Sequence, residues 1–128
     1  MGLGKKLLLL LFLIPVLSWA ATNGSWANIK AKDYVDYKNS IHTNFTKEDI
    51  EKHIMSLAEA YSSSNAWNQS KKQERSFCAP EEVGLNLFNY IQIIDNEIKK
   101  FPHTLKDNHR LSLILLSGLG GSFPCNNQ

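Results

Sequence analysis

Apolar residues recur at intervals of three and four positions along most of the chain, the spacing that gives an α-helix one buried face. No segment alternates apolar and polar positions as a half-buried β-strand does. Residues 32–41 predict a first, short helix with Tyr34, Tyr37 and Ile41 on one face. The pattern therefore indicates an all-α protein.

A second helix is predicted to begin at Thr46, because Thr46 and Asp49 have the spacing of a capping box. Three serines and Asn65 predict the end of this helix, so that residues 62–76 form a long, exposed and mostly polar loop. The apolar stripe of the predicted helix consists of Ile50, Ile54, Leu57, Ala58 and Tyr61.

A third helix is predicted to begin at Pro80, because proline fits the first turn of a helix and the acids Glu81 and Glu82 suit its positive end. Pro102 predicts where it ends. Its length and wide apolar stripe indicate a central position. The stripe consists of Val83, Leu87, Tyr90, Ile91, Ile94 and Ile98, widened by Leu85 and Phe88.

After a short turn at residues 103–106, Asp107 or Asn108 is predicted to cap a last helix, which the glycines at 118–121 end. Leu111, Ile114, Leu115 and Leu119 share one face of it. Leu113 and Leu116 make the helix apolar nearly all round, which indicates burial on most sides or an interface. The expected fold is a small bundle of about four helices with one disulfide.

Residues 1–20 have the order of a secretion signal: Lys5 and Lys6, an apolar run, and small residues at Ser18 and Ala20. The apolar run is too short to cross about 30 Å of hydrocarbon, so no stable membrane anchor is expected. Cleavage after Ala20 would leave residues 21–128 as the mature domain.

The balance of basic and acidic residues gives no indication of nucleic-acid binding. The chain of 128 residues has 14 Lys and Arg and 12 Asp and Glu. Lys5 and Lys6 fall within the predicted leader, which leaves 12 of those 14 basic residues against 12 acidic ones. A neutral body of this length predicts one domain without a basic surface for nucleic acid or anionic membranes.

The two cysteines, Cys78 and Cys125, both lie beyond the predicted leader. In an oxidising compartment such a pair most simply forms one disulfide, and closing so long a loop contributes about 4 kcal/mol in the chain-entropy model. The alternative is a reactive thiol, which would need a nearby base and an electropositive setting that the sequence does not indicate.

The sequence predicts no enzyme, metal or cofactor. The histidines, His42, His53, His103 and His109, have no partner at metal-ligand spacing and are interpreted as surface residues. There is no serine-hydrolase motif and no phosphate loop. A thiol enzyme would require Cys78 to be free.

The second half of the chain combines Cys-x-Pro-x-x-Val at 78–83, a helix of about 20 residues, Phe-Pro-His at 101–103, and an apolar helix before Ser-Phe-Pro-Cys at 122–125. This order resembles the Rap/Tai family of immunity proteins of bacterial type VI secretion systems. The resemblance covers residues 77–125. Two further cysteines that many family members carry have no counterpart in residues 34–41 or 54–61.

The resemblance implies a periplasmic protein that binds a cognate peptidoglycan amidase toxin of the cysteine-peptidase type, occludes its active site, and protects the producer and sister cells. It also implies a possible homodimer. Candidate contact residues are exposed positions between helices, with Trp67 as the first aromatic anchor to test. They are Trp67, Lys71, Lys72, Arg75, His103, Thr104 and Lys106.

Two other functions are compatible with an exported helical protein. One is a periplasmic holdase chaperone that exposes apolar surface at low pH. The other is a secreted eukaryotic binding module, in which Asn23, Asn44 and Asn68 would carry glycans because each begins an Asn-x-Ser/Thr triplet.

Overall fold

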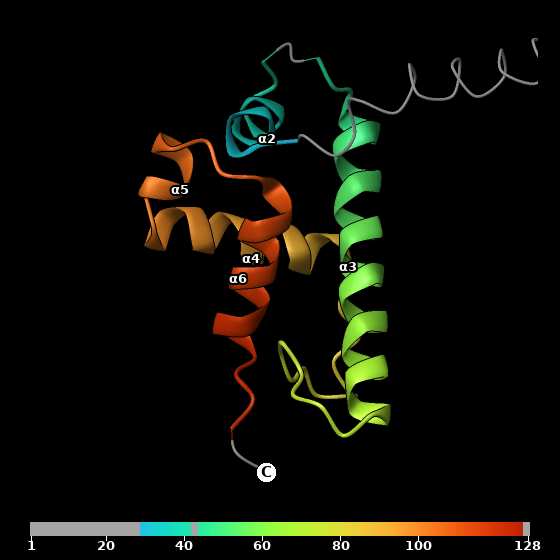
Figure 1. Ribbon diagram of the computed structural model, residues 1–128. Helices are drawn as coiled ribbons and strands as arrows, with labels where there is room; N and C mark the ends of the chain where they lie inside the picture. Colours follow the sequence, from blue (N-terminus) through green and yellow to red (C-terminus); the bar gives the residue numbers. More distant parts are fainter. Residues whose placement is uncertain (1–28, 42–43, 127–128) are drawn as a thin grey trace, which may run out of the picture.

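The described part of the chain, residues 29–41 and 44–126, forms five α-helices in this computed structural model (Figure 1). In this view α3 and α6 run roughly parallel, α4 passes behind α6 and reaches toward α3, and α2 and α5 lie toward one end. The helices are α2 (Ala31–Lys38), α3 (Lys47–Ser70), α4 (Leu87–Lys100), α5 (His103–Lys106) and α6 (Leu111–Ser122).

The predicted all-α bundle with one disulfide is confirmed. The described residues contain no β-strand, and Lys30 and Arg110 form only an isolated antiparallel bridge that holds the start of α2 beside the start of α6. The predicted secretion signal at residues 1–20 lies outside the described part of the chain.

The core lies where α4 packs on α6, the most extensive helix pair in the described structure. The predicted buried face of α6 is confirmed at Leu111, Ile114, Leu115 and Leu119. α4 contributes Tyr90, Ile93 and Ile94, and α2 and α3 add Tyr34, Ile50 and Ile54 from the other sides.

Gly118 lets α6 approach α4 closely. A Cβ atom at Gly118 would lie 2.6 Å from Ile93 Cγ2 and 3.3 Å from the Ile93 carbonyl oxygen. α6 ends at Ser122, directly after the glycines predicted to end it, but Gly118 lies inside the helix as a packing residue and does not end it.

We expect Gly118→Ala to lower the free energy of unfolding by about 2 kcal/mol, because the branched Ile93 side chain and a backbone oxygen block the added methyl group. Gly121→Ala is the matched control. A Cβ there meets nothing within 4 Å, so alanine should raise stability by up to about 1 kcal/mol through helix propensity. Urea unfolding checks both, and equal effects of the two variants would contradict the close approach.

α3 begins as predicted and ends later than predicted. The Asp49 amide donates to Thr46 Oγ1 at 3.1 Å, and the Thr46 amide donates to Asp49 Oδ2 at 2.9 Å, which confirms the capping box. The predicted stop at Asn65 is wrong, because the helix runs on to Ser70. Asn65 faces inward and is buried, so its side chain binds the neighbouring segment instead of ending the helix.

α4 begins at Leu87, so its predicted start at Pro80 is wrong. Asn86 and Asn89 form a capping box in which each side chain accepts the other residue's amide hydrogen. This box fixes the helix start seven residues after Pro80, whose carbonyl instead accepts the Val83 amide in a turn. Val83 is consequently exposed, outside the buried stripe.

Two smaller differences concern the ends of α2 and α6. Ile41, predicted on the buried face of the first helix, is exposed because α2 ends at Lys38 and Ser40 has a positive φ. α6 begins after Arg110, so neither predicted cap, Asp107 or Asn108, is used. Asn108 instead accepts the Lys32 amide at 3.0 Å.

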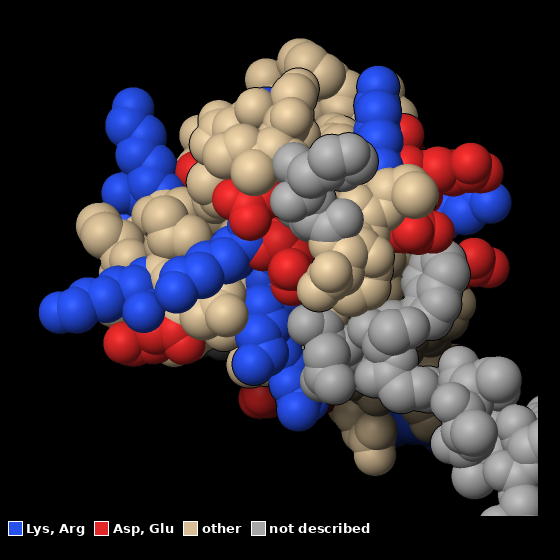
Figure 2. All heavy atoms as spheres, turned by 90° about the horizontal axis from the view of Figure 1, so that it is seen from above, with Lys and Arg blue, Asp and Glu red and all other residues tan. Residues whose placement is uncertain are grey.

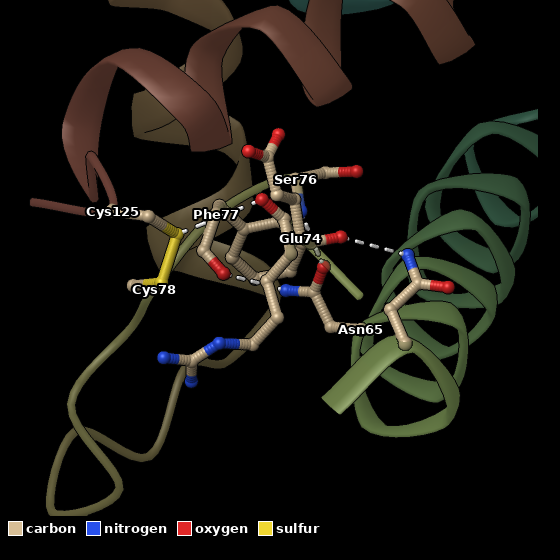
Figure 3. The surroundings of a disulfide bond; sticks show 8 residues. Asn65, Glu74, Ser76, Phe77, Cys78 and Cys125 are labelled. Carbon is tan, nitrogen blue, oxygen red and sulfur yellow. Dashed lines mark hydrogen bonds between the residues drawn. A yellow bond between two sulfur atoms is a disulfide. The ribbon is translucent and has the colours of Figure 1, made fainter. Parts of the chain in front are cut away.

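The disulfide between Cys78 and Cys125 is confirmed and joins the segment after α3 to the segment after α6 (Figure 3). The Cys78 amide donates to the Phe123 carbonyl at 2.8 Å beside it. From α3, Asn65 Nδ2 donates to the Phe77 carbonyl at 2.7 Å, and the Ser76 amide donates to Asn65 Oδ1 at 2.9 Å. Three segments that are distant in sequence thus meet at one end of the bundle.

Candidate functional site: a groove along α6

A groove of about 600 Å³ lies between α4, α5 and α6 and reaches the segment before the disulfide. We call it the α6 groove. Its volume falls within the range of pockets that bind small molecules. It is lined by Ser76, Glu97, Phe101, His103, Thr104, His109, Leu113, Ile114, Leu116, Ser117 and Gly120.

The walls of the α6 groove are largely apolar. Leu113 is 58 % exposed and Phe101 is 37 % exposed, while Leu116 is half-buried. Both leucines belong to the helix whose apolar character extends nearly all round. Apolar side chains that gather in a groove mark an interaction site more often than isolated surface leucines do.

An acidic group, Glu97, lies in this apolar setting. Glu97 is only 7 % exposed, and the Ser117 hydroxyl donates to its Oε1. No Lys, Arg or His among the described residues forms an ion pair with it. A buried carboxylate is normally paired with a cation, so Glu97 is a groove residue that lacks its usual kind of partner.

Asp95, two residues earlier on the same helix, shows the contrast. The Tyr34 hydroxyl donates to Asp95 Oδ1 at 2.7 Å, and Lys38 Nζ lies 3.1 Å from Oδ2. Burial and the acceptor carboxylate raise the pKa of Tyr34 above its usual value. This less buried carboxylate thus has a cation and a hydroxyl as partners, whereas Glu97 has a hydroxyl alone.

Two histidines form part of the groove rim. The His103 ring lies 5.7 Å from the His109 ring and 5.9 Å from the Phe101 ring, both edge-on. His53 lies on α3, outside the groove, and burial lowers its pKa. His103 is exposed as predicted, His53 and His109 are half-buried, and His42 lies outside the described residues. Across residues 29–41 and 44–126, no group of three His, Cys, Asp or Glu side chains could hold a metal ion.

Of the contact residues predicted at 103–106, two are exposed and one is buried. His103 lines the groove and is exposed, and Lys106 is exposed on the same one-turn helix. The prediction that Thr104 is exposed is wrong: it is buried, and its hydroxyl donates to the Phe101 carbonyl at 2.8 Å. Thr104 therefore shapes the groove without presenting its side chain to a partner.

The other predicted contacts lie at the end of α3. Trp67 belongs to the helix instead of a loop, is 62 % exposed, and has Lys71 Nζ 4.8 Å from its ring centroid. Lys72 follows with a positive φ and is exposed, and Arg75 is half-buried. None of these four residues lines the groove, and Ser76 is where this segment reaches it.

Sequence reasoning did not select Glu97 or Leu113 as site residues. The spacing of Glu97 from Ile94 and Tyr90 places it on the buried face of α4, so a charge at this position was the available signal. The signal for Leu113 was the surplus of apolar residues on α6 beyond one buried face.

Charge is mixed on the face of the molecule seen in Figure 2, where basic and acidic side chains alternate and neither sign covers the surface. None of the described helices combines the length and apolar character that crossing a bilayer requires. Comparisons with protein-family models, with curated proteins and with solved structures find no match to this chain.

Proposed function

We propose that this protein is an exported immunity protein that binds a peptidoglycan amidase toxin of a type VI secretion system and occludes its active site. The observation that carries the binding role is the α6 groove, which presents exposed Leu113 and Phe101 around the buried Glu97 carboxylate. The leader-like residues 1–20 support export, and the resemblance at residues 77–125 supports the choice of toxin.

The architecture suits an antagonist. The disulfide and the Asn65 hydrogen bonds hold the segment at residues 76–78 in place at one end of the groove. A preformed surface loses little conformational entropy on binding, so more of the contact energy appears as affinity. Blocking an enzyme by covering its active site needs no catalytic group on the blocking protein.

The direct test is protection of cells. The full chain is expressed together with an amidase toxin directed to the periplasm, the toxin being the one encoded beside this protein's gene. We expect growth to be restored by the full chain and not by a chain lacking residues 1–20, whereas the purified, oxidised mature protein inhibits the amidase in solution. If the chain neither protected the cells nor inhibited the amidase, the proposal would be refuted.

The groove is expected to be the binding surface. Leu113→Asp should weaken toxin binding at least tenfold, because an exposed apolar contact is replaced by a charge, while stability changes by less than about 0.5 kcal/mol. Calorimetric titration against the toxin measures the affinity. Met55→Asp, at another exposed apolar position on α3 outside the groove, is the matched control and should bind normally.

Trp67→Ala separates the two candidate surfaces. If the toxin uses the groove, this substitution leaves affinity within a factor of about two of the original. A large loss with Trp67→Ala and none with Leu113→Asp would instead place the toxin on the end of α3.

A holdase function is the second candidate, because the same exposed apolar side chains could hold unfolded clients. A holdase should suppress aggregation of several unrelated proteins at low pH and bind a hydrophobic dye there. An antagonist should bind one enzyme tightly and leave those clients to aggregate.

A further inference from the structure

The α6 groove contains a negative charge without a positive partner. Glu97 is 7 % exposed, and Ser117 donates to Oε1 only. Every fully buried side-chain nitrogen or oxygen in the described residues has a hydrogen-bond partner. Oε2 accepts from no described donor and is therefore not fully buried, and Glu97 is one of the residues that line the groove.

No cation of the described chain fills this position. Lys100, three residues after Glu97 on α4, has its Nζ 5.4 Å from the centroid of the Phe101 ring and forms no ion pair with Glu97. A buried carboxylate without a cation is uncompensated, so a cation supplied by a partner gains from pairing with Glu97 where the approaching partner also covers the pair.

The side chains that line the α6 groove favour one kind of cation over another. Phe101 and His103 offer aromatic rings, and Leu113 and Leu116 offer aliphatic surface, on the way to Glu97. A guanidinium group suits this setting better than an ammonium group, because it is planar, stacks on rings, is weakly hydrated and donates two parallel hydrogen bonds to a carboxylate. Its aliphatic stem fits beside leucine side chains.

We propose that the α6 groove is an arginine-binding site, in which a partner's arginine, flanked by apolar residues, pairs with Glu97 between Leu113 and Phe101. This deepens the proposed function and rests on it for the identity of the partner, the toxin. The arginine is then the central anchor of the interface, and the leucines around it exclude water from the ion pair.

The experiment uses the oxidised mature protein and the peptide acetyl-Leu-Arg-Leu-amide, with Gln and Lys versions for comparison. We expect saturable NMR shifts of amides that line the groove. The dissociation constant should rise about tenfold when Arg is replaced by Gln, since a charge-assisted hydrogen bond is lost, and rise less with Lys. Equal binding of the Arg and Gln peptides, or shifts confined to other surfaces, would overturn the proposal.

Glu97→Gln tests the residue itself, with its fold checked by urea unfolding. The variant keeps an acceptor for Ser117 and should lose the preference for the Arg peptide, whereas Glu59→Gln, an exposed charge on α3, should keep it. An intact preference in folded Glu97→Gln would refute the site. Because comparing peptides on the unmodified protein needs no variant, a failure of Glu97→Gln to fold leaves that comparison decisive.

Two results separate this inference from the proposed function. Cell protection without an arginine preference would overturn only the arginine site. An arginine preference without protection would overturn only the immunity function. Groove amides that shift on dilution of the free protein would show a second copy of the chain as the occupant and would refute the arginine site.

Discussion

Replacing both Cys78 and Cys125 by serine is expected to lower the free energy of unfolding by about 4 kcal/mol. The disulfide joins residues 47 positions apart, and an unfolded chain without this link regains the entropy of a long loop. Changing both residues together avoids a free thiol that could react.

Urea unfolding of the double variant and of the unmodified protein, each with and without reductant, measures the effect. Reductant should destabilise the unmodified protein to the level of the variant and leave the variant unchanged. A loss below about 1 kcal/mol would mean that the reduced chain keeps the two segments together in its unfolded state.

The disulfide also bears on function, because it fixes the segment that ends at the α6 groove. Cys78 lies two residues after Ser76, which lines the groove, and the Cys78 amide donates a hydrogen bond to the Phe123 carbonyl. We therefore expect the double variant to bind the toxin more weakly even at temperatures where it remains folded. This dependence on oxidation agrees with the proposed export of the protein.

Local signals predicted those parts of the fold that depend on neighbouring residues. The buried face of α6 followed from its spacing, and the start of α3 followed from Thr46 and Asp49. The start of α4 was misplaced because two local signals compete within a few residues, and the Asn86–Asn89 box outweighs Pro80. Sequence alone gives no rule for ranking a proline against such a box.

Tertiary contacts explain the features that sequence reasoning missed. α3 extends past three serines because Asn65 binds a segment that reaches it only in the folded chain. The groove likewise requires Glu97 of α4, Ser117 of α6 and His103 of α5 to meet, and no spacing along the chain encodes that meeting. Local propensity is overridden in each case by burial or long-range hydrogen bonds.

Asn65→Ala is expected to lower the free energy of unfolding by about 3 kcal/mol, because it removes two hydrogen bonds and leaves the Phe77 carbonyl without its donor beside the buried Phe77 side chain. Asn65 is the link between α3 and the disulfide region (Figure 3). Losing it should also free residues 76–77 to move, which makes their amides exchange faster with solvent.

Ser63→Ala is the matched control for Asn65→Ala, since Ser63 is an exposed residue on the same helix. This variant's free energy of unfolding should differ from that of the unmodified protein by less than about 0.5 kcal/mol. Urea unfolding and hydrogen exchange measure the two variants together. Should Asn65→Ala cost no more than Ser63→Ala, the Asn65 side chain would not be what extends α3 to Ser70. In that case helix propensity alone would explain the length of α3, and the segment at residues 76–78 would depend on the disulfide for its position.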